Sequence, residues 1–240
     1  KNKVLYCVDV LKNQNVKLND RIMYKGNNSV NWAAWSIATN SLGGIFVPLY
    51  QNQNENYVYH IIEDCDPKLF ITNNVYKNVN IFNDYIEDIN SNEIVPVEPK
   101  SDISKLIYTS GTTGTPKGVM LTHDNIIHNI QNIEKRFHDL RNEREYTTLS
   151  ILPWAHIYGL TTELYYNMLN NNKIAISSGP EQFVKEIGEI QPDLLYLVPR
   201  VLQMIKKKIE FLDKPLIRCI LPLILKKIFG MINNYYFVFL

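Results

Sequence analysis

Short β-rich runs alternate with helical stretches along most of the chain, and this order restricts the fold more than any other feature of the sequence. The expected strands are residues 21–25, 45–49, 68–72, 103–109, 119–122, 147–152, 173–177, 194–198 and 235–240. The expected helices cover residues 30–41, 55–64, 124–140, 159–169, 180–190, 200–211 and 215–229. Residues 73–100 are polar and weakly periodic, which indicates a surface excursion. Strands that alternate with helices are typical of an α/β fold with mainly parallel sheets flanked by helices.

Local signals define the ends and faces of some of these elements. Asn28 and Ser29 precede the helix of residues 30–41 and can cap its N-terminus, and Gly43 follows its end. In the helix of residues 124–140 the apolar residues recur at helical spacing. The face that they form is expected to contain Ile126, Ile127, Ile130 and Ile133.

The balance of charges excludes one class of function. The 25 Lys and Arg residues against 24 Asp and Glu residues leave a formal net charge of +1. Nucleic-acid-binding domains normally carry a strong basic excess. Hydrophobic residues form 45% of the 240-residue chain, which is enough for a sizeable core, so disorder is not expected. The composition therefore predicts a globular protein without a nucleic-acid partner.

The cysteines and the apolar C-terminal stretch argue against three other classes. Cys7, Cys65 and Cys219 are far apart and form no CxxC pattern, so neither a disulfide scaffold nor a zinc site is expected, and a reducing compartment is favoured. Residues 216–240 are very apolar, but three basic residues interrupt them. Their longest uncharged run, residues 228–240, is shorter than the roughly 20 residues that cross a bilayer. No membrane span is expected.

One segment, YTSGTTGTPKG at residues 108–118, carries the residue types that bind phosphate groups. Its glycines let the backbone turn tightly and approach an anion. Its backbone N–H groups and hydroxyls supply hydrogen-bond donors, and Lys117 supplies a positive charge. The segment follows an apolar strand and is expected to form a loop over residues 111–118. The sequence therefore predicts a polyphosphate-binding loop, with a plain flexible turn as the alternative.

The loop does not match the Walker A motif of P-loop NTPases, G-x-x-x-x-G-K-[ST]. Counted from Gly111, the position of the second glycine is Pro116, and the residue after Lys117 is Gly118. The loop therefore lacks the hydroxyl that would hold Mg²⁺ in a Walker site. Pro116 also prevents a helix from forming across the lysine. A kinase-like NTPase is therefore excluded.

The longer segment YTSGTTGTPKGVMLTH (residues 108–123) resembles the phosphate-binding signature of the adenylate-forming, or AMP-binding, enzymes, in the acyl-CoA synthetase branch. Other stretches are similar to blocks of the same family. They are the opening block, which comprises residues 20–32 and GGIFVPLY (43–50), then LPWAHIYG (152–159), and the block from Pro192 to the VPRV at 198–201. The resemblance covers most of residues 20–212. It implies the N-terminal part of a long-chain acyl-CoA synthetase, also called a fatty-acid–CoA ligase.

The resemblance also implies a reaction and its co-substrates. A fatty-acid carboxylate attacks the α-phosphate of ATP to give an acyl-adenylate and pyrophosphate, and coenzyme A then displaces AMP. Mg²⁺ is the implied cofactor, and no metal ligand is assigned among the candidate residues. The positions that match the phosphate-binding motif are Thr109, Ser110, Gly111, Thr112, Thr113, Gly114 and Lys117. Lys117 and His156 are the implied catalytic residues.

The residue types alone give weaker support for a functional role of the remaining candidates. A lone histidine between a strand and a helix is more often structural, and only the LPxxH context favours a functional His156. Trp154 fits an acyl pocket and a core equally well. Arg200 is interpreted as a structural residue near a helix N-terminus. His123 and His128 are expected at the surface, because they are not at metal-ligand spacing.

Several family motifs are missing from the sequence, including Y-G-x-T-E, whose glutamate would hold Mg²⁺. Residues 1–240 are therefore expected to form a partial N-terminal AMP-binding domain without the C-terminal domain, and to turn over poorly alone. A catalytically dead remnant or a nucleotide-binding module is the alternative. The resemblance implies a cytoplasmic protein, with peripheral contact at the endoplasmic reticulum or another membrane left open.

Overall fold

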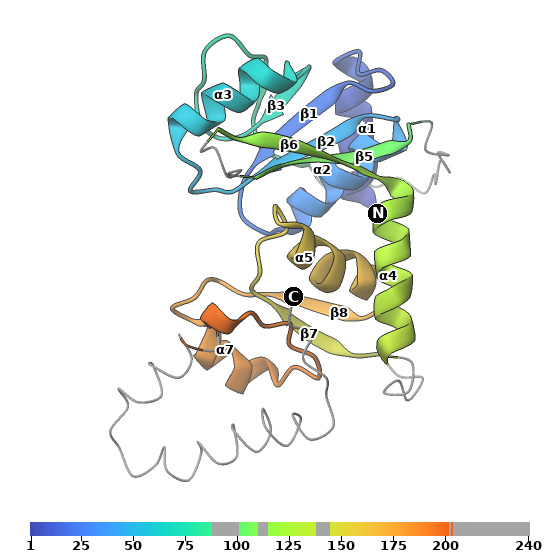
Figure 1. Cartoon of the computed structure of the whole chain (residues 1–240), viewed down its shortest axis with the longest axis vertical. Coiled ribbons are helices and arrows are strands. Elements are labelled where there is room, and N and C mark those ends of the chain that lie inside the picture. The colour runs from blue at the N-terminus through green and yellow to red at the C-terminus, as the bar shows by residue number, and fades with distance from the viewer. Residues whose placement is uncertain (88–100, 110–114, 138–144, 202, 204–240) are drawn as a thin grey trace.

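The computed structural model describes residues 1–87, 101–109, 115–137, 145–201 and 203 (Figure 1). Its larger sheet has six strands in the order β4-β3-β1-β2-β5-β6. These strands are β1 (Arg21–Lys25), β2 (Ile45–Leu49), β3 (Leu69–Ile71), β4 (Ile81–Phe82), β5 (Ile103–Thr109) and β6 (Lys117–Thr122). All neighbouring pairs are parallel except β5 with β6, which forms an antiparallel edge. The predicted α/β fold with mainly parallel sheets flanked by helices is confirmed.

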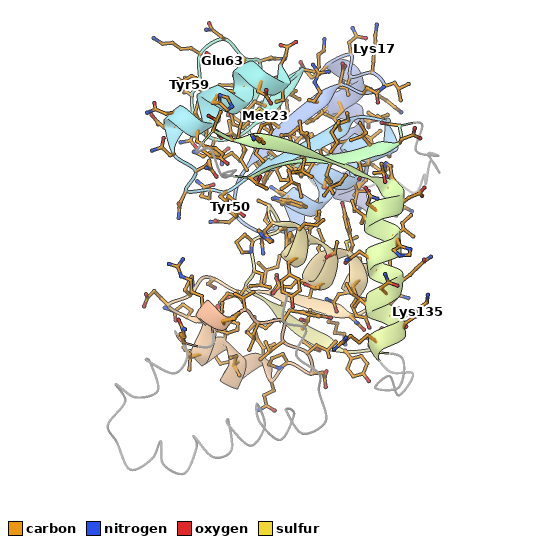
Figure 2. All side chains as sticks on the ribbon, in the orientation of Figure 1. Lys17, Met23, Tyr50, Tyr59, Glu63 and Lys135 are labelled. Carbon is orange, nitrogen blue, oxygen red and sulfur yellow. The ribbon has the colours of Figure 1, made fainter. Side chains whose placement is uncertain are left out.

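Helices cover both faces of this sheet because its strands are apolar on both sides. Ile22 and Tyr24 pack with α1 (Asn2–Asn13) and α2 (Val30–Ser41). Met23, between them in the sequence, faces the opposite way and packs with α3 (Glu55–Cys65) (Figure 2). Successive side chains of a strand point to opposite faces, so a continuous apolar run joins two helical layers.

A second, smaller sheet pairs β7 (Thr147–Ser150) in parallel with β8 (Lys173–Ile176). Helix α4 (His123–Phe137) runs from the first sheet to the second, and α7 (Phe183–Ile190) packs on β7 through Phe183 and Leu149 (Figure 1). Between the two sheets lie α5 (Ile157–Gly159), the π-helix η2 (Leu160–Tyr165) and α6 (Tyr166–Leu169), which follow one another without a break (Figure 1).

Aromatic rings and one buried lysine join the two sheets. The rings of Trp32 in α2 and Trp154 meet edge to face, with their centroids 5.6 Å apart. Lys105 of β5 is fully buried, and its Nζ lies 5.6 Å from the ring centroid of Phe46 and 5.5 Å from that of Tyr165 in η2. The Lys105 ammonium also donates to the side chain of Asn40. Burial lowers the pKa of Lys105 below its ordinary value.

Several predicted elements have the predicted bounds, and others do not. Strands 21–25, 45–49 and 103–109 are confirmed to the residue. The excursion over residues 73–100 contains the short strand β4. Residues 194–198 form no strand, and only a single bridge joins Thr148 to Leu194. The helix expected at 159–169 divides into three segments.

Two further expectations are corrected by the local structure. Lys117 and Gly118 were expected in the loop, but they belong to β6, because the antiparallel ladder with β5 continues to the pair Thr109–Lys117. Ile127 is 47% exposed, whereas Ile126 and Ile130 are buried. The helix and strand expected at 215–229 and 235–240 lie outside the described residues. In the part of the chain that the structure describes, no helix is long and apolar enough to cross a membrane.

Candidate functional site

The two ends of the predicted phosphate loop meet as neighbours on the hairpin of β5 and β6. Thr109, the last residue of β5, pairs with Lys117, the first residue of β6. Both residues are exposed. The pairing holds the lysine next to the threonine at the mouth of the loop. The predictions for Ser110, Gly111, Thr112, Thr113 and Gly114 concern residues outside the described ranges.

Gly118 lets side chains of β5 pack closely against β6 at the mouth of the hairpin. It pairs with Tyr108, and a Cβ on Gly118 would lie 2.9 Å from Leu106 Cδ1 and 3.1 Å from Tyr108 Cζ. Glycine at this position therefore leaves room for the side chains of Leu106 and Tyr108 against β6. Gly118 thus has a packing role next to the loop.

The hairpin mouth lies at the carboxyl edge of the larger sheet. Lys25 of β1 is level with Leu49 of β2, and β2 continues in parallel register to β5, with Phe46 opposite Lys105. The carboxyl ends of β1, β2 and β5 therefore share one edge. In open α/β sheets, ligands bind outside this edge. The position of Thr109 there agrees with the predicted anion site.

His156 is the N-cap of α5, at the end of the loop that follows β7. Its Nδ1 accepts a hydrogen bond from the backbone N–H of Tyr158, with 3.2 Å between the nitrogens. A neutral imidazole that accepts at Nδ1 carries its proton on Nε2. The side chain is exposed. His156 therefore presents an N–H donor of the kind that binds a phosphate or carboxylate oxygen.

Asn28 attaches the loop before His156 to the edge of the larger sheet. Its Oδ1 accepts from the backbone N–H of Trp154 at 2.8 Å, and its Nδ2 donates to the carbonyl of Leu152 at 2.8 Å. Asn28 follows the carboxyl end of β1. Ser29, rather than Asn28, caps α2 by accepting from Trp32 N–H at 3.0 Å. The His156 loop therefore lies at the same edge of the larger sheet as the mouth of the hairpin.

Glu163 of η2 holds the same loop from the other side. Its carboxyl group accepts from the backbone N–H groups of Ile151 and Leu152, at 3.1 Å and 3.0 Å, and from the Ser150 hydroxyl at 2.5 Å. Ser150 in turn accepts from Trp154 Nε1 at 3.0 Å. Burial raises the pKa of Glu163 to about 8, although these hydrogen bonds act to lower it.

Glu163 is the residue of this site that the sequence interpretation missed. Its signal was a charged side chain on the inward face of an apolar helix, because Leu160 and Leu164 are both buried beside it. Charged residues are almost never fully buried unless they are paired. The partners of Glu163 are mainly backbone N–H groups in a loop, and a sequence pattern does not show them.

The other candidate residues are placed as follows. Trp154 is buried in the core, which decides between its two interpretations. Arg200 is exposed near a helix N-terminus. His123, which was expected at the surface, is half-buried, and burial lowers its pKa. The described ranges contain no group of three His, Cys, Asp or Glu side chains that could hold a metal ion.

Comparisons with known proteins identify the family of the chain. The sequence model of the AMP-binding enzyme family matches residues 3–221. A long-chain-fatty-acid–CoA ligase of Bacillus subtilis is 44% identical over 110 residues, which are 45% of this chain and 20% of that protein. The long-chain-fatty-acid–CoA ligase ACSBG2 of Mus musculus is 24% identical over 226 residues, which are 77% and 34% of the two chains.

Among solved structures, ATP-bound MatB from Rhodopseudomonas palustris is similar with a TM-score of 0.72 and 19% identity, over 89% of this chain and 45% of that one. This likeness shows the fold of the adenylate-forming enzymes. The chain spans a fifth to a third of the length of the two curated relatives. Because the family match extends over most of its residues, the chain belongs to the AMP-binding enzyme family.

Proposed function

We propose that the protein containing this chain activates a long-chain fatty acid with ATP and transfers the acyl group to coenzyme A. The observation that carries the proposal is the hairpin that places Thr109 beside Lys117, at the same sheet edge as the loop of His156. Membership of the AMP-binding family supports ATP as the nucleotide substrate. The fatty-acid–CoA ligases among the relatives support a long-chain fatty acid as the acyl substrate.

In this reaction a carboxylate oxygen attacks the α-phosphorus, and the bond to the bridging oxygen of pyrophosphate breaks. Negative charge builds up on the departing pyrophosphate. The Lys117 ammonium and the Thr109 hydroxyl, at the mouth of the loop, are suited to stabilise that charge. The Nε2–H of His156 is suited to donate to an oxygen of the acyl carboxylate or the α-phosphate.

The second half-reaction uses coenzyme A as a co-substrate. Its thiolate attacks the acyl carbonyl carbon, and AMP leaves with the electrons of the broken mixed-anhydride bond. Mg²⁺ would supply further neutralisation of the phosphate charge when bound. We further propose that the protein is cytoplasmic. Because a long acyl substrate partitions into lipid, the protein is proposed to contact a membrane peripherally.

The test is fatty-acid-dependent exchange of labelled pyrophosphate into ATP, with AMP release on addition of coenzyme A. Lys117→Ala is expected to lower the exchange rate by about 100-fold or more, as removal of one charge-stabilising group does. Lys135→Ala is the matched control, because Lys135 is an exposed lysine on α4 (Figure 2). It is expected to leave the rate unchanged.

Two results would contradict the proposal in different ways. Exchange that persists in Lys117→Ala at the wild-type rate would remove Lys117 from the mechanism. ATP binding without any fatty-acid-dependent exchange in the wild-type protein would favour a nucleotide-binding module without ligase activity. An exchange that depends on another carboxylic acid would keep the adenylation chemistry and change the acyl substrate.

A further inference from the structure

Helix α3 contacts the chain on both sides of the phosphate loop. The contacts come from His60 and Asp64, which are four residues apart. Residues at this spacing lie on one face of a helix, one above the other. His60 contacts Pro116, just before Lys117, and Asp64 contacts Tyr108, just before Thr109. One helical face therefore meets both strands of the hairpin at its mouth.

The contact at the far end of the loop is directional. His60 Nε2 lies 3.2 Å from the carbonyl oxygen of Pro116. A carbonyl oxygen only accepts, so Nε2 must carry a proton and donate. This carbonyl belongs to the peptide bond that joins Pro116 to Lys117. The hydrogen bond therefore fixes the peptide plane from which Lys117 begins.

The contact at the near end of the loop joins two side chains. The Tyr108 hydroxyl donates to the Asp64 carboxylate. Burial, and then the Asp64 hydrogen bond, raise the pKa of Tyr108 above its ordinary value, so the phenol stays protonated and donates throughout the neutral range. The ring of Tyr108 also lies against Gly118 on the opposite strand. The contact therefore fixes both sides of the hairpin mouth.

We propose that His60 and Asp64 are positioning residues that hold Thr109 and Lys117, through their neighbours Tyr108 and Pro116, in the separation and orientation that bind the phosphates of ATP. The inference rests on the proposed function insofar as the ligand is ATP. Fixing these two residues before binding removes part of the entropy cost of ordering them around the ligand. Loss of either anchor therefore weakens ATP binding, whereas the affinity for the fatty acid stays unchanged.

The test measures the ATP dissociation constant by calorimetry, together with KM for ATP and for fatty acid, in the purified protein. His60→Ala and Asp64→Ala are each expected to weaken ATP binding roughly three- to tenfold, the effect of one lost hydrogen bond. His60→Gln and Asp64→Asn keep a donor and an acceptor, respectively, and are expected to restore most of the affinity. Glu63→Ala is the control, because Glu63 is exposed on the same helix (Figure 2).

Tyr108→Phe provides a second test that removes a single hydroxyl. Combined with Asp64→Ala, it is expected to weaken ATP binding no more than Asp64→Ala alone, because the two residues make one contact. Additive losses, or an unchanged ATP affinity in folded His60→Ala and Asp64→Ala variants, would overturn the proposal. If Asp64→Ala does not fold, Tyr108→Phe and His60→Ala decide the result.

The two proposals fail separately. If the wild-type protein shows no fatty-acid-dependent exchange but the anchor variants bind ATP more weakly, the ligase function fails and the anchoring role stands. If exchange is present and the variants change KM for fatty acid instead of KM for ATP, the anchoring role fails and the ligase function stands.

Discussion

Glu163 has a carboxyl group in a position where ionisation is costly. The side chain is fully buried, and its pKa of about 8 lies far above the ordinary value of 4.5. The folded protein therefore holds a proton that the unfolded chain releases. The stability that this proton confers is complete below pH 4.5 and is lost as the pH rises towards 8.

Replacing Glu163 by Gln is expected to remove this pH dependence. Gln keeps an acceptor oxygen for the backbone N–H groups of Ile151 and Leu152. Its amide nitrogen replaces the carboxyl oxygen that accepts from Ser150, and the side chain cannot ionise. The melting temperature of the wild-type protein is expected to fall relative to Glu163→Gln between pH 5 and 8. The difference in unfolding free energy is on the order of a few kcal/mol, at about 1.4 kcal/mol for each pKa unit.

Glu186→Gln is the control for that measurement. Although burial acts to raise it, the pKa of Glu186 is lowered by hydrogen bonds from Ser177 and Ser178. Its stabilising contribution is therefore lost on acidification and is constant between pH 5 and 8. Parallel melting curves for the wild-type protein and Glu163→Gln across this range would show that Glu163 is already ionised in the folded protein.

At the scale of single residues, the sequence predicts groups whose chemistry is local. Lys117 and Thr109 stand in a motif that itself requires a strand, a turn and a cation, and the structure places them side by side. Glu163 and Asn28 act through contacts with a loop that lies far from Asn28 in the sequence. Such contacts depend on how the two sheets meet, which residue types alone do not specify.

At the scale of elements, Gly159 of α5 lies very close to the loop that precedes this helix. A Cβ on Gly159 would lie 2.6 Å from the carbonyl oxygen of Pro153 and 3.1 Å from the Cβ and the carbonyl oxygen of Leu152. These are mostly backbone atoms, which cannot rotate away. Gly159 therefore lets the loop of residues 152–156 fold back on α5 and places His156 at its N-terminus.

Gly159→Ala is expected to destabilise the protein by about 1–3 kcal/mol, as overpacking does. Because the loop must move away from α5, pyrophosphate exchange is expected to fall in the fraction that remains folded. Gly188→Ala is the matched control, since no atom lies within 4 Å of its added Cβ in α7. It is expected to stabilise the helix by up to about 1 kcal/mol. Equal effects of the two substitutions would contradict the close-packing argument.

The elements that the sequence predicts to the residue are α2 and the strands β1, β2 and β5. Most residues of these three strands are buried between helical layers. The helix expected at residues 159–169 has the right position but contains the π-helical turn of η2. The buried Glu163 lies within that turn. Ile127 fits the apolar periodicity of α4, yet it lies on the outer side because the second sheet meets only one side of this helix.

At the scale of the whole molecule, the two sheets meet through polar contacts as well as aromatic packing. Lys105 lies over the ring of Tyr165, and Ser36 and Tyr165 share a hydrogen bond of 2.9 Å. Asn28 adds the contacts to Leu152 and Trp154 at the carboxyl edge. Asn28 forms hydrogen bonds to the loop that carries His156, which Trp32 also contacts through the ring of Trp154. Asn28 therefore connects the geometry of the larger sheet with that of the site.

Substitutions at the neighbouring residues Asn28 and Ser29 distinguish the role of this connection from the general stability of α2. Ser29→Ala removes the cap of α2 and is expected to cost about 1 kcal/mol, without lowering pyrophosphate exchange per folded molecule. Asn28→Ala leaves the Trp154 N–H and the Leu152 carbonyl without their partner. It is expected to lower exchange as well as stability, because the His156 loop is no longer fixed to the larger sheet.

Hydrogen exchange measured at single amides distinguishes the two variants. The backbone N–H of Trp154 donates to Asn28 Oδ1, so its exchange is expected to become faster in Asn28→Ala and to stay unchanged in Ser29→Ala. The amide of Trp32, which donates to Ser29 Oγ, is expected to behave in the opposite way. If the Trp154 amide keeps its protection in Asn28→Ala while catalysis is lost, Asn28 must act on the ligand itself instead of connecting the two sheets.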